Sequence, residues 1–232
     1  MAPLTVALLG LGEAGSALAG DLVAAGVFVR GFDPAAGHDV PGVHRAADAR
    51  AAVDGSDVVL SVTAASAALE AAGGAAGGLR HGQVYADLNA SGAALKRAVA
   101  EVVAPTGAQF ADVALMGIVP RDGLRTPALV SGPGAEAFAE RLRPLGMPVE
   151  ILGDEPGAAA TRKLLTLAIL DAKHAEPGTE VTLVWGEEGG GTDKPTVEPH
   201  VQTEIRGVVA PVPIVGAVRS SYAPGGWRAA HA

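Results

Sequence analysis

The chain has 232 residues, of which 49% are hydrophobic and 3% aromatic, and its 25 acidic and 17 basic side chains give a formal charge of −8. This length allows one domain or slightly more, and the acidic balance argues against a nucleic-acid partner, because binding to a phosphate backbone rests on a basic surface. The chain has no cysteine, which excludes disulfides and cysteine-bound metals and favours a reducing cytoplasm, and no stretch approaches the roughly twenty apolar residues of a membrane span.

The first 150 residues alternate strand-like and helix-like patterns, which predicts an α/β fold with a doubly wound, mostly parallel sheet covered by helices. Strands are expected at residues 4–10, 27–33, 57–62, 83–88, 108–115 and 127–132. Helices are expected at residues 16–26, 93–104 and 135–145. The Ala/Gly-rich tract at residues 71–79 is interpreted as a loose helix end and not as a linker.

The pattern changes after Asp171. Residues 179–185 and 201–209 alternate polar and apolar side chains with a period of two, and the polar, glycine-rich stretch "GEEGGGTDKP" lies between them. This arrangement is typical of an antiparallel pair. The sequence therefore predicts an α/β domain at residues 1–165, followed by a short β-rich segment at residues 166–232.

The stretch "GLGEAG" follows the first predicted strand directly and opens the first predicted helix. Its three glycines match the G-x-G-x-x-G pattern of Rossmann-type dinucleotide sites: Gly10 permits the tight turn, Gly12 lets a diphosphate approach, and Gly15 lets helix and strand pack closely. Asp33 ends the second strand, where its carboxylate can accept ribose hydroxyls. The alternative is a glycine turn in an ordinary α/β protein. The predicted cofactor-binding residues are Gly10, Leu11, Gly12, Glu13, Ala14, Gly15, Asp33, Val62 and Thr63.

Asp33 also bears on the choice between NAD and NADP. Its carboxylate repels a 2′-phosphate, and the segment "DPAAGHD" that it begins contains no arginine or lysine to bind one. His38 offers only weak compensation. The sequence therefore favours NAD over NADP.

Five ordered segments between residues 4 and 165 resemble the β-hydroxyacid dehydrogenase superfamily, in particular its NAD-binding, 6-phosphogluconate and 3-hydroxyisobutyrate dehydrogenase-like branch. They are "VALLGLGEAGSALAGDLVAAG", "YADLNASGAALK", "FADVALMG", "LRTPALVSG" and "GMPVEILGDEPGAAATRKLL". The resemblance implies a Rossmann domain and the oxidation of a small hydroxy acid by hydride transfer to the nicotinamide. It implies Lys163 as the catalytic acid/base, six residues after Gly157, and Asn89, Ser91 and Gly117 as substrate-binding residues.

The proposed role of Lys163 is chemically reasonable. Oxidation of a hydroxyl needs a base near the departing proton, and a desolvated lysine beside a cationic ring has its pKa lowered into a useful range. The alternative is a solvated lysine on a helix surface, which is the usual place for this residue type.

The resemblance ends just beyond Lys163. Family members continue into a long helix and an all-helical domain that closes the substrate site and often builds the dimer, whereas here Leu167 stands where the superfamily often has an asparagine. The following sixty residues resemble the C-terminal portion of aminomethyltransferase-like proteins, especially tetrahydrofolate-dependent O-demethylases. The chain thus resembles a junction of two genes near residues 165–170, which a natural fusion, a genomic deletion or an assembly artefact would produce.

Three functions are compatible with these patterns: an NAD-dependent oxidoreductase acting on a small hydroxy acid, a dinucleotide-binding remnant without turnover, and a tetrahydrofolate-dependent methyl-transfer protein. The six histidines are scattered without metal-ligand spacing, so no metal site is expected. The expected partner is a small hydroxy acid, with no nucleic acid and no membrane, and a homo-oligomer is possible.

Overall fold

The computed structural model of this chain describes residues 4–35, 39–166, 176–185 and 202–209. Contacts divide the chain into two compact units, Met1–Lys163 and Leu164–Ala232, which are described separately below. The predicted boundary at residue 165 between two functional domains stays a prediction.

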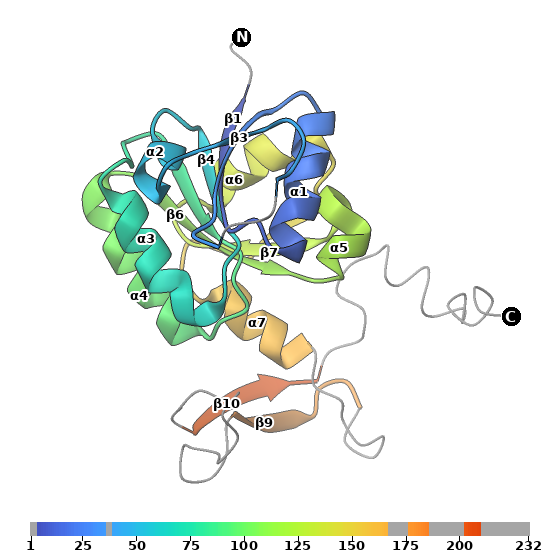
Figure 1. Cartoon of the computed structure of the whole chain (residues 1–232). Coiled ribbons are helices and arrows are strands. Elements are labelled where there is room, and N and C mark those ends of the chain that lie inside the picture. The colour runs from blue at the N-terminus through green and yellow to red at the C-terminus, as the bar shows by residue number, and fades with distance from the viewer. Residues whose placement is uncertain (1–3, 36–38, 167–175, 186–201, 210–232) are drawn as a thin grey trace, which may run out of the picture. The chain divides into compact units, whose positions relative to one another are not determined.

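An eight-stranded sheet forms the centre of the first unit, with strand order β3-β2-β1-β4-β5-β6-β7-β8 (Figure 1). All neighbouring strands are parallel except β6 and β7, which are antiparallel. The predicted mostly parallel, doubly wound sheet is therefore confirmed. The strands are β1 (Thr5–Leu9), β2 (Phe28–Phe32), β3 (Val43–Arg45), β4 (Val58–Ser61), β5 (Val84–Asp87), β6 (Gln109–Leu115), β7 (Ala128–Ser131) and β8 (Val149–Ile151).

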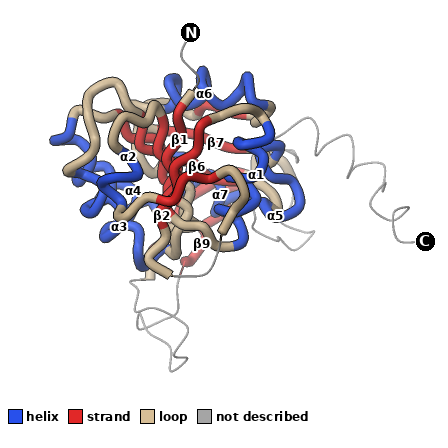
Figure 2. The backbone as a smooth tube through the Cα atoms, turned by 45° about the horizontal axis from the view of Figure 1, so that its top comes forward, coloured by secondary structure: helices blue, strands red, loops and turns tan. Residues whose placement is uncertain are grey.

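Helices cover both faces of this sheet, and Figure 2 shows the strands as a layer between them. The helices of this unit are α1 (Glu13–Ala24), α2 (Ala49–Val53), α3 (Ala68–Ala76), α4 (Ala93–Val103), α5 (Val119–Asp122), α6 (Ala135–Leu142) and α7 (Ala158–Thr166), with 3-10 turns η1 (Ala65–Ala67), η2 (Ala104–Thr106), η3 (Gly123–Arg125) and η4 (Arg143–Leu145).

The hydrophobic core consists of two layers, because successive side chains of a strand point to opposite faces. In β1, Val6 and Leu8 belong to a buried cluster with α1 and α6, whereas Ala7 and Leu9 belong to a second cluster with α2, α3 and α4. All four of these strand residues are almost fully buried, at 0–1% exposure. Burial on both faces explains why the strand has a continuous apolar sequence without alternation.

The elements that sequence patterns missed are the shortest ones. β3 and β8 have three residues each, too few to establish a period, and α2 has five. α2 begins where Asp48 accepts a hydrogen bond from the N–H of Ala51 at 2.7 Å. The interpretation of residues 71–79 as part of a helix is confirmed by α3, and the helix expected from Ser16 starts earlier, directly after Gly12.

The second unit contains an antiparallel pair of strands, β9 (Glu180–Trp185) and β10 (Thr203–Val208). This confirms the predicted antiparallel pairing. The polar stretch at residues 186–195 and the Pro/Gly-rich tail lie outside the described residues, as do His38, His174, His200 and His231. None of the helices described in either unit is long and apolar enough to cross a membrane.

Candidate functional site

The carboxyl ends of β1, β2, β4 and β5 meet at one edge of the sheet (Figure 1). From β1 the chain runs through α1 to β2 and β3 on one side of β1, and it then crosses to β4 on the other side. The direction in which strands are added to the sheet therefore reverses between β1 and β4. Ligands of doubly wound sheets bind in the crevice outside the strand ends at such a reversal. The segments that follow these four strands contain most of the predicted site residues.

The first turn after β1 needs glycine at two positions for steric reasons. Gly10 has a φ of +98°, and a Cβ there would overlap the carbonyl oxygen of Val62, which follows β4. A Cβ on Gly15 would overlap the carbonyl oxygen of Gly10. The turn is held in place by the N–H of Gly10, which donates to the oxygen of Phe32 at 2.8 Å. These contacts account for the first and third glycines of the motif without any ligand.

Gly12 differs from the other two glycines because a Cβ at this position would meet no heavy atom of the described residues within 4 Å. It is exposed and stands at the N-cap of α1, with extended backbone angles that any residue can adopt. The first N–H groups of a helix lack partners within it and carry a partial positive charge, which suits a diphosphate. No contact within the described part of the chain requires a glycine here, whereas a ligand that approached the backbone closely would require one.

Asp33 lies against the same turn. Its Oδ2 accepts a hydrogen bond from the N–H of Leu11 at 2.6 Å, and its Oδ1 accepts one from the N–H of Ala35 at 2.9 Å. The carboxylate is half-buried and therefore has a fixed place at the end of β2, next to the glycine turn. A ribose bound beyond a diphosphate at Gly12 would meet this carboxylate.

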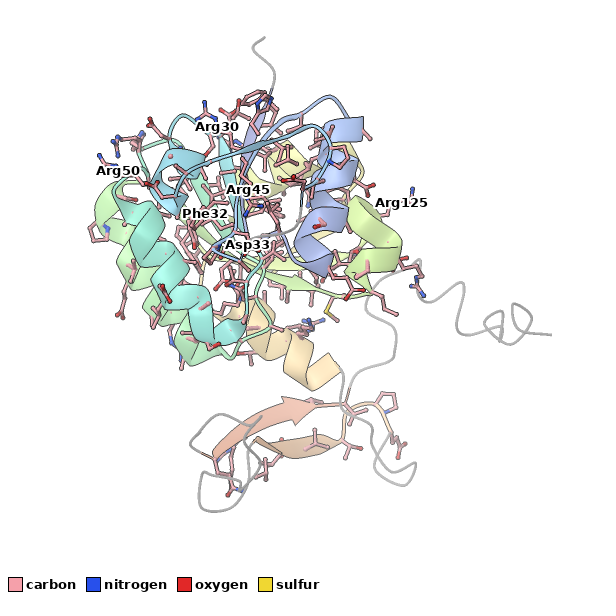
Figure 3. The ribbon with its side chains drawn as sticks, viewed as in Figure 1. Arg30, Phe32, Asp33, Arg45, Arg50 and Arg125 are labelled. Atoms are coloured by element: carbon pink, nitrogen blue, oxygen red, sulfur yellow. The ribbon has the colours of Figure 1, made fainter. Side chains whose placement is uncertain are left out.

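Sequence patterns did not reveal Arg45. Its Nη2 donates to the carbonyl oxygens of Asp33 at 2.9 Å and Ala35 at 3.3 Å, so an exposed guanidinium lies across the turn after β2 (Figure 3). Arg45 ends β3, twelve residues after Asp33, and the parallel pairing of β2 with β3 brings it there. Arg45 lies outside residues 33–39, and sequence patterns do not predict the strand β3 that brings it to the turn.

Two of the predicted site residues bind one another. The N–H of Thr63, after β4, donates to Asn89 Oδ1, after β5, at 2.5 Å. Asn89 is only 4% exposed, and its Nδ2 lies 3.4 Å from Ser61 Oγ. The Asn89 side chain therefore ties the ends of two neighbouring strands together, and a role for it in substrate binding stays a prediction.

Ser91 and Gly117 lie in the loops that follow β5 and β6. The hydroxyl of Ser91 is buried and, among the described residues, has no hydrogen-bond partner. Gly117 is exposed, and a Cβ there would lie 3.3 Å from Thr126 Cγ2. Within the described part of the chain, no hydrogen bond joins Ser91, Gly117 and Lys163, and their grouping into one substrate site stays a prediction.

Lys163 lies in α7, and the start of this helix is placed by Gly157. Gly157 has a φ of +96°, and a Cβ there would come 2.8 Å from the Cβ of Ala93, the first residue of α4. The first turn of α7 therefore lies beside the loop that carries Asn89 and Ser91. Burial lowers the pKa of Lys163, and the positive charge of Lys96 lowers it further. Both effects favour the neutral amine, which is the form that accepts a proton.

Comparison with solved structures gives the same fold. A conserved hypothetical protein from Sinorhizobium meliloti is 33% identical, with a TM-score of 0.65, over 70% of this chain and 58% of that one. The 3-hydroxyisobutyrate dehydrogenase of Mycobacterium tuberculosis, solved with L-serine, is 26% identical, with a TM-score of 0.61, over 70% of this chain and 58% of that one. The chain thus spans less than two thirds of either protein.

The chain also matches part of a protein of a different kind. It is 64% identical over 66 residues to the syringate O-demethylase of a Sphingobium species, a match that takes in 28% of this chain and 14% of that enzyme. The resemblance to O-demethylases that the sequence predicted is confirmed as a partial homology.

The larger match is to the NAD-binding domain of 6-phosphogluconate dehydrogenase and covers residues 5–147, more than half of the chain. It includes the glycine turn, Asp33 and the ends of β4, β5 and β6. The chain therefore belongs to the family of the 6-phosphogluconate dehydrogenase NAD-binding domain.

Proposed function

We propose that the chain binds NAD(H) across the carboxyl ends of β1, β2 and β4, with the diphosphate over Gly12 and the adenosine ribose at Asp33. The observation that carries this proposal is the position of Gly12 at the start of a helix that directly follows a buried strand, where a Cβ would meet no atom of the described residues within 4 Å. The residues proposed to contact the cofactor are Gly10, Leu11, Gly12, Glu13, Ala14, Gly15, Asp33, Val62 and Thr63.

NAD is expected to bind with a micromolar to sub-millimolar dissociation constant, and NADP more weakly by at least about tenfold, or about 1.4 kcal/mol. The reason is repulsion between the Asp33 carboxylate and a 2′-phosphate. Asp33→Ala should reduce the difference in affinity between NAD and NADP, since Arg45 remains beside the turn as a cation for the 2′-phosphate. Adding Arg45→Ala to that variant should increase the difference again. Titration calorimetry with both cofactors measures these differences, and equal affinities in the unmutated protein would contradict the claim.

We further propose that the chain oxidises a small hydroxy acid, with Lys163 as the acid/base. A bound nicotinamide would supply the acceptor for the hydride that leaves the carbon bearing the hydroxyl. Lys163 takes the hydroxyl proton at its Nζ, for which its lowered pKa prepares it. Ser91, whose buried hydroxyl has no hydrogen-bond partner among the described residues, is proposed to line the substrate site together with Asn89 and Gly117.

A second candidate is cofactor binding without turnover. It is favoured by the departure from the family pattern after Lys163, since the helical domain of the resembling enzymes supplies the enclosure that excludes water from the reaction. Assays with a panel of small hydroxy acids, run beside the NAD titration, separate the two candidates. Turnover of any member of the panel supports the first, and saturable NAD binding without turnover supports the second.

We propose that the β-rich segment at residues 166–232 neither binds tetrahydrofolate nor transfers methyl groups, although the chain is partly homologous to an O-demethylase. A cofactor pocket needs polar groups converging from a well-formed cleft, and a two-stranded pair is by itself only marginally stable. Val184 and Val208 are 51% and 61% exposed, so this pair is suited to association with another surface, including a second copy of the chain.

Deleting residues 176–232 is expected to lower solubility or melting temperature while NAD binding stays measurable. The reason is that every residue proposed to contact the cofactor lies within residues 10–63. Calorimetry with NAD and with tetrahydrofolate, on the intact and the shortened chains, checks this. Saturable tetrahydrofolate binding to the intact chain that disappears on deletion would show that the segment has a function of its own.

A further inference from the structure

A buried group of three charges lies between α4 and the sheet. Lys96 is 1% exposed, and its Nζ donates to the carbonyl oxygen of Asp87 at 2.7 Å. The same Nζ lies 3.4 Å from Asp87 Oδ1 and 3.3 Å from Asp112 Oδ1, and both carboxylates are completely buried. Asp87 and Asp112 are neighbours in the register of β5 and β6. Burying a charged side chain costs free energy unless the charge is paired and hydrogen-bonded. This group is therefore a candidate for a functional role.

The other oxygen of Asp112 binds the start of α7. Its Oδ2 accepts hydrogen bonds from the N–H groups of Gly157 at 3.1 Å and Ala160 at 3.0 Å. Ser131, which pairs with Asp112 across β6 and β7, accepts one from the N–H of Ala159 at 3.0 Å. Three N–H groups at the start of the helix therefore find partners on the sheet, and the helix supplies no capping side chain of its own for them.

We propose that Asp112, held by Lys96, is the positioning residue for Lys163: it joins the buried charge group to the first turn of α7 and thereby fixes where the lysine of that helix stands. The inference rests on the proposed role of Lys163, but neither of its main tests requires turnover.

The short distance along α7 makes the coupling between Asp112 and Lys163 direct. Lys163 is five residues beyond Ala158, which corresponds to a rise of about 7.5 Å along the helix axis. A carboxylate at the start of a helix stabilises the helix through its hydrogen bonds and through its attraction to the partial positive charge there. Lys96 also acts on Lys163 itself, because its charge is one of the two causes that lower the Lys163 pKa. The same buried group therefore influences both the place and the proton affinity of the lysine.

Hydrogen exchange tests the positioning. Asp112→Asn removes the carboxylate charge at the helix start and replaces one of the two oxygens of the side chain by an NH2 group, which cannot accept a hydrogen bond. Exchange of the amides at residues 157–163 is expected to rise about tenfold, while exchange in α1 stays within about twofold. Ser131→Ala should speed the exchange of Ala159 with no change of charge. As a matched control, Asp48→Ala removes the cap of α2 and should speed exchange at residues 49–53 alone.

The pKa of Lys163 provides a second measurement, which would not change if the buried group had a purely structural role. The chain has four lysines, Lys96, Lys163, Lys173 and Lys194, so isotope-labelled side-chain signals can be assigned by single substitution. In Lys96→Met the pKa of Lys163 is expected to rise toward the ordinary lysine range, because a nearby positive charge is removed. In Ser131→Ala and Asp48→Ala this pKa should stay low.

Wild-type exchange at residues 157–163 in Asp112→Asn would overturn the inference, as would an unchanged pKa of Lys163 in Lys96→Met. If Asp112→Asn does not fold, wild-type exchange of Ala159 in Ser131→Ala overturns it instead. Absence of NAD binding by the unmutated chain would refute the proposed function, whereas the exchange measurement would still decide whether Asp112 holds α7.

Discussion

Lys163→Ala is expected to reduce any hydroxy-acid oxidation by this chain about 10²- to 10⁴-fold while NAD affinity changes by no more than a few fold. The lysine would serve the hydroxyl of the substrate beside the nicotinamide and not the diphosphate, which lies in the middle of the cofactor between its two ribose groups. Steady-state rates and NAD titrations of the variant check both halves of this expectation. Undiminished turnover would show that another residue is the acid/base.

The rate should also depend on pH in a defined direction. Oxidation needs the neutral amine, so the rate is expected to rise with pH and level off at or above the pKa of Lys163. Burial in the first place, and Lys96 in the second, lower that pKa, so the plateau should begin below the range of an ordinary lysine. A rate that is independent of pH across this range would contradict the assignment.

Gly12→Ala is expected to weaken NAD binding about a hundredfold, or about 2.8 kcal/mol, in a protein that is otherwise normally folded. The added methyl group would meet no atom within 4 Å in the part of the chain that the structure describes, and the backbone angles of Gly12 suit alanine. Its effect would therefore fall on the cofactor, in the space proposed for the diphosphate. Calorimetry and thermal unfolding of the same sample separate affinity from stability. Wild-type NAD affinity in this variant would show that the diphosphate does not bind over Gly12.

Two other glycines of α1 provide matched controls for this experiment. A Cβ on Gly15 would overlap a backbone carbonyl, so Gly15→Ala should destabilise the fold by about 1–3 kcal/mol and weaken NAD binding as a consequence. A Cβ on Gly20, in the middle of the helix, would meet no atom of another described element within 4 Å, so Gly20→Ala should leave NAD binding unchanged and stabilise the fold by about 0.5–1 kcal/mol. The three variants place the same methyl group in three environments that only the structure distinguishes.

The features that sequence reasoning could predict are local ones. Apolar runs such as residues 4–10 and the spacing of Gly10, Gly12 and Gly15 are properties of short segments, and the sheet and the glycine turn follow from them. Arg45 and the Lys96 group are different, because the distances that define them depend on strand register. Asp87 and Asp112 are 25 positions apart in sequence and become neighbours only through the pairing of β5 with β6. The cap of α7 likewise comes from β6 and β7 and leaves no signature in the helix itself.

Titration calorimetry of the intact chain with NAD measures whether the first unit binds the cofactor. We expect saturable binding of one NAD per chain, with a micromolar to sub-millimolar dissociation constant. Binding should weaken about a hundredfold in Gly12→Ala and persist in Gly20→Ala. A folded, unmutated chain that shows no saturable binding of either NAD or NADP would contradict the proposed function.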